Sequence, residues 1–250
     1  MPISRRTRTA IAAVVMLVGT TACGNSSSDK DTAATTTKAE TTTTSAEAST
    51  TSESESESSS AAAEERAEAA NLTLDDLPDG WTSTPNGEEN DSNVFDTCGD
   101  LDLDEITVAK VSSDNFEYAT ADGGGLTLTT TSGVFDSEEN AQAMVDIIGE
   151  QAFADCTTAA MADLAAVPGM TGSVAPTPAG ELPEVADQVG ALSGEFTIPT
   201  PQGNSTMRVM LIAVRTGDLV TTISGTAIDT EPDGALMNDV VNLVVDRQAD

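Results

Sequence analysis

The sequence predicts an α+β fold, an antiparallel β-sheet with two or more packed helices, and two observations carry that prediction. Three long segments of strand-like composition follow one another at 189–198, 207–215 and 219–227, joined by links of hairpin length that contain Gly. Two segments that begin near residues 136 and 232 carry apolar residues at helical spacing. Strands joined by short links pair antiparallel, and amphipathic helices bury their apolar face against such a sheet.

The elements are expected in a clear order along residues 71–250, which we take as one domain. Its first part comprises a short strand at Trp81, strands at 106–111, 116–120 and 126–131, a helix capped by Asp136 with Glu139 that buries Ala141, Met144, Val145, Ile148 and Ala152, and a helix through 156–165. Its second part comprises a loop rich in Pro and Gly, the three long strands, and a helix over 232–247 that buries Leu236, Val240, Leu243 and Val244. The segment 207–215 is apolar on both faces, which is typical of a central strand.

Charge excludes several classes of function. The 250 residues include 42 acids, 10 bases and no histidine, and residues 71–250 alone hold 32 acids against four bases. Nucleic acid is therefore not expected as a partner, because it binds clustered Lys and Arg. Triads and metal sites built on histidine are impossible, and no G-x-S-x-G motif occurs. We expect a protein that is not an enzyme and needs no cofactor.

Residues 1–22 have the layout of a secretory signal peptide. Three arginines precede the nine apolar residues of Ala10–Val18, which are too few for the roughly 20 that span a bilayer. Thr20, Thr21 and Ala22 then lead directly to Cys23, and here the segment resembles a bacterial lipoprotein signal, with Thr20 where that motif usually has Leu. Ordinary cleavage after Ala22 is the alternative, and a twin-arginine export signal is less favoured.

The number of cysteines favours the lipoprotein interpretation. Acylation of Cys23 would leave Cys98 and Cys156 to form one disulfide, whereas an unmodified Cys23 would be a free thiol in an oxidising compartment. The C-x-x-C spacing of a redox pair is missing, and neighbouring acids would raise a thiol pKa. The resemblance implies a diacylglycerol thioether on Cys23, which anchors the protein to the outer face of the cell membrane.

A disordered tether is expected over residues 23–70. Of the 47 residues after Cys23, 40 are Ser, Thr, Ala or Glu, and none is aromatic or a large aliphatic. Such a segment cannot bury enough apolar surface to offset the entropy lost on ordering. Its last residues, Ala61 to Ala70, have the composition of a marginal helix.

Asp100, Asp102 and Asp104 form the tightest acidic cluster and are weak candidates for a metal site. Their spacing is that of the start of an EF-hand loop, but Glu105 stands where that loop needs Gly and Val111 where it needs a bidentate Glu. A solvated acidic loop is the better interpretation.

Several short motifs follow the tether in a recognisable order. They are Leu77-Pro78-x-Gly80-Trp81, Cys98, Phe135-x-Ser137-x-x-x-x-Ala141 and Phe153-x-x-Cys156. Together they resemble a broad group of actinobacterial lipoproteins, whose domains are similar to the extracellular sensor domain of mycobacterial Ser/Thr kinases. That sensor pattern has two disulfides, whereas this domain has cysteines for one. The resemblance implies a non-catalytic surface module and transfers no functional residue.

Two functions remain open from the sequence. The first is a ligand-binding or sensing module that captures a small molecule, a lipid or another envelope component in an apolar cleft between sheet and helices. The second is an interaction module whose acidic surface binds a basic protein or cations.

Overall fold

The computed structural model describes residues 51–86, 94–99, 101–121, 123–165, 167–178, 185–232 and 234–249. The chain divides into two units, and all of the described residues belong to the second, Ala48–Asp250. The expected signal peptide, Cys23, the first part of the expected tether and Asp100 lie outside the described residues.

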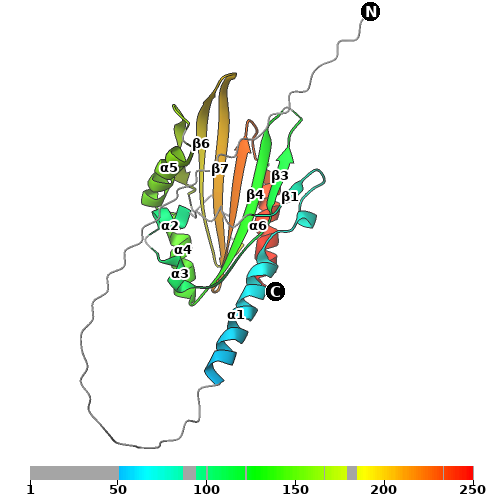
Figure 1. Cartoon of the computed structure of the whole chain (residues 1–250), viewed down its shortest axis with the longest axis vertical. Helices are drawn as coiled ribbons and strands as arrows, with labels where there is room; N and C mark the ends of the chain where they lie inside the picture. Colours follow the sequence, from blue (N-terminus) through cyan, green and yellow to red (C-terminus); the bar gives the residue numbers. More distant parts are fainter. Residues whose placement is uncertain are drawn as a thin grey trace, which may run out of the picture. The chain divides into compact units, whose positions relative to one another are not determined.

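An antiparallel sheet and six α-helices make up the described part of the chain (Figure 1). The strands are β1 Thr82–Thr84, β2 Thr107–Ser112, β3 Asn115–Ala119, β4 Gly125–Phe135, β5 Thr171–Pro176, β6 Gln188–Thr200, β7 Gly203–Thr216 and β8 Leu219–Ile228. The helices are α1 Thr51–Ala70, α2 Val94–Cys98, α3 Leu103–Ile106, α4 Glu138–Ile148, α5 Gln151–Ala165 and α6 Gly234–Gln248, with a 3-10 turn at Leu74–Asp76. The predicted fold class is confirmed.

The strands are ordered β1-β3-β4-β8-β7-β6-β5, and β2 also pairs with β4. Strands β6, β7 and β8 are joined by hairpins, as the sequence predicts, and β7 lies between the other two. The tight turn from β7 to β8 is possible because Gly217 adopts a φ of +61°, a conformation that costs glycine little.

Strands β2 and β3 share one edge of β4, and the register changes between them. Ser112 pairs with Thr131 but Phe116 pairs with Leu128, so the β2–β3 side has one extra residue. Ser113 fills this bulge: its backbone N–H donates to the Thr130 carbonyl, and its hydroxyl accepts the Thr130 N–H at 2.9 Å. A second irregularity lies between Thr107 and Ala109. Strand β2 is therefore a short edge strand between two bulges.

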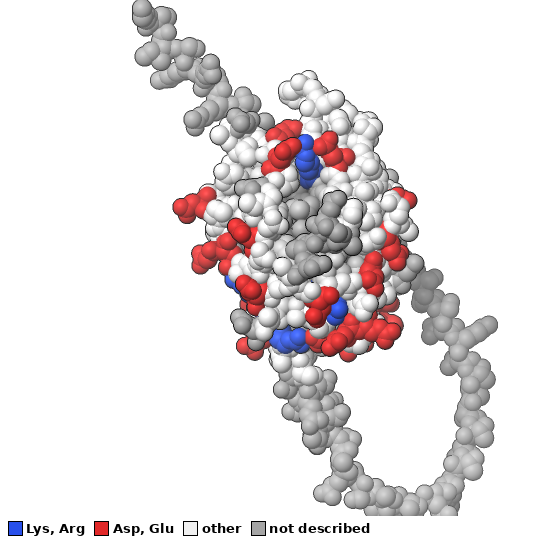
Figure 2. Space-filling model, turned by 180° about the vertical axis from the view of Figure 1, so that it is seen from behind, with Lys and Arg blue, Asp and Glu red and all other residues white. Residues whose placement is uncertain are grey.

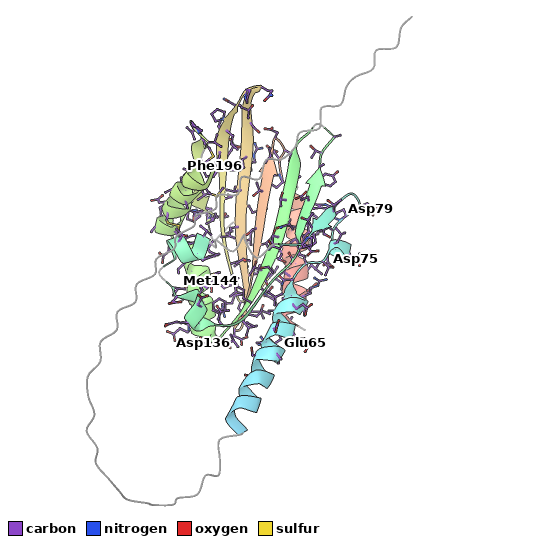
Figure 3. All side chains as sticks on the ribbon, in the orientation of Figure 1. Glu65, Asp75, Asp79, Asp136, Met144 and Phe196 are labelled. Atoms are coloured by element: carbon purple, nitrogen blue, oxygen red, sulfur yellow. A yellow bond between two sulfur atoms is a disulfide. The ribbon has the colours of Figure 1, made fainter. Side chains whose placement is uncertain are left out.

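One face of the sheet packs against α2, α4 and α5. Its core is formed by Phe95, Phe135, Ala141, Met144, Val145, Ile148, Phe153, Ala154, Val174, Leu192, Phe196, Leu211, Ala213 and Val220. Figure 3 shows Met144 and Phe196 between the helices and the strands, with the labelled acids around the periphery. Helix α4 comes close to β6 because Gly190 has no Cβ, which would lie 2.8 Å from the Val145 carbonyl oxygen.

The opposite face of the sheet packs against α6 and α1. Met237, Val240, Val241 and Val244 of α6 are buried, and Leu236 and Leu243 of the predicted stripe are partly buried beside them. Helix α6 was expected over 232–247 and is found over Gly234–Gln248. This end of the domain is therefore well predicted by helical spacing.

Helix α1 extends the packed unit into the segment that was expected to be tether. Ala63, Ala67 and Ala70 are buried against Val134 and Leu219 of the sheet. Their spacing of four and three residues places them on one face of a helix, which explains why an alanine-rich segment packs here. The packed chain therefore begins before residue 71, while the N-terminal part of α1 extends beyond the sheet (Figure 1).

The start of α4 differs from the prediction by one residue. Ser137, not Asp136, is the N-cap, because its backbone is extended and its hydroxyl accepts the N–H of Asn140. Asp136 instead accepts a hydrogen bond from the Asn140 side chain at 2.6 Å. Helix α4 ends at Ile148 with Gly149 as its C-cap, so Ala152 belongs to α5, where it is exposed and not buried as predicted.

Candidate functional site

A groove of about 530 Å³ lies between the sheet and the helices that cover its first face. Strands β2, β3, β4 and β8 form its floor, and α2, α3 and Met144 of α4 form its wall. The volume is within the range of small-molecule sites, roughly 300–1,000 Å³. The groove is the candidate site, and it lies between sheet and helices, where the sequence placed a cleft.

The floor of the groove is rich in hydroxyl and amide side chains. They are Thr107, Ser112, Asn115, Thr129, Thr131, Thr222 and Ser224, and Lys110 of β2 is the charged residue among them. The register explains their arrangement, because Thr131 pairs with Ser112 of β2 on one side and with Thr222 of β8 on the other, which gives one row across three strands. Thr129 and Ser224 are directly paired in a second row. Side chains at every second residue of β4 therefore face the groove.

Hydrogen bonds connect the floor residues to one another. The hydroxyls of Ser112 and Thr131 are 2.9 Å apart, and Thr129 donates to the Asn115 side chain at 2.8 Å. Asn115 in turn donates to Asn86, and the Thr222 hydroxyl donates to the Thr131 carbonyl. A hydroxyl offers one donor and two acceptor positions, so these contacts orient the floor and leave acceptor capacity toward the groove.

The wall and one end of the groove are apolar. They consist of Val94, Phe95, Leu103, Phe135, Met144, Leu211 and Val220. A disulfide joins Cys98 of α2 to Cys156 of α5, which are the two cysteines paired in the sequence analysis. Phe95 of α2 also stacks on Phe153 of α5, with ring centroids 5.2 Å apart. The disulfide and this ring pair hold α2 in place as the wall of the groove.

The groove is nearly neutral within an acidic molecule. Lys110 and Asp104 are the charged side chains among its described lining residues. Acidic side chains are spread around the face of the molecule shown in Figure 2, and the few basic ones lie beside them. The ion pairs include Arg66–Asp218, Arg208–Glu195, Arg208–Glu231, Arg215–Asp187 and Arg247–Asp76. The polar floor is therefore a local exception to the surface charge.

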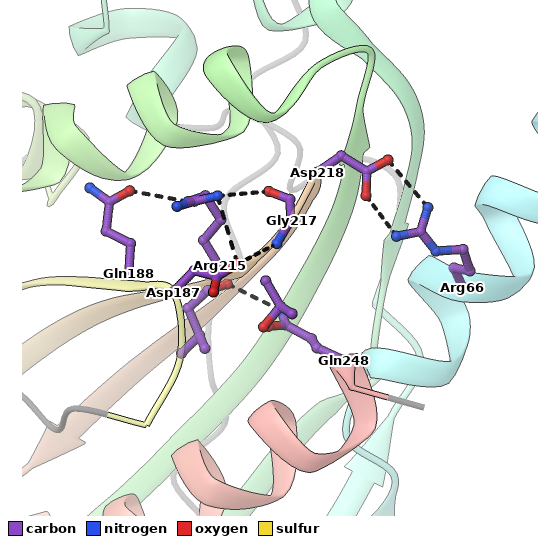
Figure 4. Close-up of polar contacts among 9 residues, drawn as sticks. Arg66, Asp187, Gln188, Arg215, Gly217, Asp218 and Gln248 are labelled. Carbon is purple, nitrogen blue, oxygen red and sulfur yellow. Dashed lines mark hydrogen bonds and ion pairs between the residues drawn. The ribbon is translucent and has the colours of Figure 1, made fainter.

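Two carboxyl groups with displaced pKa values lie outside the groove lining. Arg66 donates two hydrogen bonds to Asp218 and holds the pKa of that carboxyl below its ordinary value (Figure 4). The backbone N–H of Thr206 and the hydroxyl of Ser205 lower the pKa of Asp229 in the same way. Both shifts follow from hydrogen bonds that favour the charged form.

Of the acidic cluster predicted at Asp100, Asp102 and Asp104, Asp100 lies outside the described residues and the other two lie at the start of α3. Asp102 precedes α3 as its N-cap residue, and Asp104 lies in the first turn of that helix and lines the groove. Within the described ranges, no three Asp, Glu or Cys side chains come together in a way that could hold a metal ion.

The groove differs in polarity from the apolar cleft that the sequence predicted. The sequence signal for its floor is present, since threonines alternate with Leu126 and Leu128 along β4. That alternation also fits a strand with one solvated face. Only the pairing with β2 and β8 shows that these threonines form the floor of a groove.

No helix in the described part of the chain is long and apolar enough to cross a bilayer.

No family model and no curated protein matches the sequence. Two solved structures from Mycobacterium tuberculosis are loosely similar. LpqN, described as involved in cell envelope biogenesis, has a TM-score of 0.30 and 12% identity over 68% of this chain and 78% of its own. The extracellular domain of PknH has a TM-score of 0.38 and 11% identity over 75% of this chain and 96% of its own. The expected loose similarity to the extracellular domain of a mycobacterial kinase is therefore found.

Proposed function

We propose that this protein is an extracytoplasmic, non-catalytic binding module, anchored to the outer face of the cell membrane through acylated Cys23, whose groove binds an uncharged amphipathic small molecule. The observation that carries the proposal is the division of the groove into a hydroxyl-rich floor and an apolar wall. Such a lining offers hydrogen bonds to one part of a ligand and an apolar surface to another.

The two halves of the groove would contribute differently to binding. Apolar contacts with Phe95, Met144 and Leu211 remove hydrocarbon from water and supply most of the favourable free energy. The floor around Thr131 and Thr222 supplies orientation, because a ligand hydroxyl or amide buried there needs partners. A ligand that is apolar at one end and polar at the other satisfies both.

Charge favours an uncharged ligand over an anion. Residues 71–250 carry 32 acids and four bases, and the resulting field lowers the local concentration of anions. Chemistry on the ligand is not part of the proposal, since the whole chain lacks histidine and the floor hydroxyls have none to activate them.

Fluorescence titration with N-phenyl-1-naphthylamine, an uncharged apolar probe, tests the proposal on protein purified from membranes. Saturable binding is expected in the wild type. Ser224→Trp, which places a large side chain on the exposed groove floor, should weaken binding by about tenfold or more. Ser173→Trp is the matched control, because Ser173 is also exposed on a strand but does not line the groove. Equal binding by both variants would contradict the proposal.

Competition then tests the preferred charge. Octyl glucoside should displace the probe at lower concentration than octyl sulfate, which has the same alkyl chain but an anionic head. The reverse order would contradict an uncharged ligand.

The anchor is tested separately by labelling cells with an alkyne fatty acid, where the wild type should be labelled and Cys23→Ala should not.

A further inference from the structure

One buried side chain connects helix α1 to the floor of the groove. Asn71 directly follows α1 and is only 5% exposed. Its side-chain amide donates to the Ala67 carbonyl of α1 at 3.2 Å and to the Val111 carbonyl of β2 at 2.9 Å. Its amide oxygen accepts a hydrogen bond from Ser132 of β4. Asn71 therefore holds the end of α1 and two strands of the groove floor together.

Strand β2 has α1 on one face and the groove on the other. Ala109 and Val111 pack in the cluster formed by the buried alanines of α1. Val108, Lys110 and Ser112, at the alternate positions, line the groove, and Thr107 and Ala109 at the irregular start of the strand also contribute to its lining. The strand pairs with β4 and is flanked by irregularities of register, so its position depends on what packs against its two faces.

Helix α1 is weakly held in comparison with the rest of the fold. Among residues 59–70, whose side chains the structure describes, the buried ones of α1 are Ala63, Ala67 and Ala70, and Arg66 pairs with Asp218 at the surface. Most of the stability of a helix in a protein comes from tertiary packing of its apolar face, so α1 depends on docking against the sheet. Docking of α1 therefore depends on a small apolar contact and a few polar ones, which is typical of elements that open locally.

We infer that docking of α1 and occupancy of the groove are coupled through Asn71 and β2, so that a ligand in the groove holds α1 against the sheet. The inference rests on the proposed function, since it assigns the groove a ligand. Docked α1 fixes Ala109 and Val111 and thereby the groove face of β2. If docking of α1 raises the affinity for a ligand by some factor, linkage requires that the bound ligand favours docked α1 by that same factor. Release or docking of α1 would change how the chain leaves the domain toward Cys23.

The test uses the full chain and two variants that differ only in the helix face they alter. Ala67→Glu places a carboxylate in the contact with the sheet, whereas Ala69→Glu places it at an exposed position of α1. N-phenyl-1-naphthylamine binding and deuterium uptake in residues 60–70 are measured for both. We expect Ala67→Glu to weaken probe binding at least about fivefold relative to Ala69→Glu. We also expect saturating probe to slow uptake in residues 60–70 of Ala69→Glu and the wild type.

Each outcome decides the inference. Equal probe affinity in the two variants, with faster uptake in residues 60–70 of Ala67→Glu alone, would overturn the coupling and leave the proposed function intact. A probe that fails to bind the wild type would overturn the proposed function. In that case deuterium uptake in residues 107–112 of β2 tests whether α1 positions this strand. The inference predicts faster uptake there in Ala67→Glu than in Ala69→Glu, and equal uptake would contradict it. Fast deuterium uptake in residues 207–216 of the central strand β7 would show that Ala67→Glu fails to fold. Arg66→Gln then takes its place in the test and should weaken probe binding by a smaller factor.

Discussion

Helices α1 and α6 pack on the same face of the sheet, yet they are held there by different means. Helix α6 buries Met237 and three valines, which contribute about 6–12 kcal/mol at about 1.5–3 kcal/mol each. Helix α1 buries three alanine methyl groups, which contribute about 2 kcal/mol. Apolar burial therefore holds α6 in the core several times more strongly than it holds α1.

The two helices meet at their C-terminal ends, where polar contacts join them. Arg247 of α6 donates to the Asn71 carbonyl and pairs with Asp76 at 2.7 Å. Gln248 donates to the Thr221 hydroxyl, which in turn contacts Ser132 (part of this region is drawn in Figure 4). The end of α1 is thus placed by hydrogen bonds, whose geometry is specific, more than by apolar burial.

The largest effect is expected from Val244→Ala in α6. Val244 is fully buried, so the lost methyl groups and the resulting cavity should lower the free energy of unfolding by about 2 kcal/mol. Urea denaturation measures the change, and Val245→Ala, at a partly buried position, is the control with a smaller effect. An unchanged urea midpoint for Val244→Ala would contradict the assignment of α6 to the core.

Asn71→Ala should have the next largest effect. It leaves the Val111 carbonyl and the Ser132 hydroxyl with one partner fewer in a buried region, at a cost of about 1–3 kcal/mol. Urea denaturation measures this cost, and deuterium uptake in residues 60–70 should rise in the same variant. Asn242→Ala, at an exposed position of α6, should change neither quantity. Unchanged uptake in residues 60–70 of Asn71→Ala would show that the Asn71 contacts do not hold α1.

Arg66→Gln should have a smaller effect that is confined to α1. The Arg66 and Asp218 side chains are 51% and 34% exposed, so solvent screening keeps their pair below about 1 kcal/mol. Uptake in residues 60–70 should rise while the urea midpoint stays within error. Glu65→Gln removes a charge from the neighbouring position and should leave uptake unchanged. A lowered urea midpoint for Arg66→Gln would mean that α1 is part of the cooperative core.

The smallest effect concerns pH. The pKa of Asp218 is lowered by Arg66, so the ion pair stabilises docking at neutral pH and this stabilisation is lost as pH falls through the lowered pKa. Carbon-13 NMR of the Asp218 carboxyl should show a lower pKa in the wild type than in Arg66→Gln. Equal pKa values in the two proteins would contradict the pairing.

The sequence predicts the parts of this fold that large apolar residues hold together. The hairpins of β6, β7 and β8 and the helices α4 and α6 follow from period-2 and period-3.6 patterns of Val, Leu, Ile and Met. Strand β5 was expected to be loop, because Thr171–Pro176 contains one buried apolar residue, Val174, among Gly, Ser and Pro. Its place in the sheet comes from pairing with β6, which local composition does not show.

The parts that position the candidate site were harder to predict. The short helices α2 and α3 have too few residues for a periodic pattern. The packing of α1 depends on three alanines in a segment whose composition also fits disorder. The groove floor needs three strands in register, and the bulge at Ser113 that sets this register has no marker in the sequence.

Native-state hydrogen exchange of the full chain in increasing urea tests the contrast between the two helices most directly. We predict that amides in residues 60–70 exchange through local opening, with a free energy well below that of global unfolding and little dependence on urea. Amides in residues 240–246 of α6 should exchange only by global unfolding, with the full urea dependence. Equal free energies and equal urea dependence for the two helices would contradict the account, because α1 would then be as much a part of the core as α6.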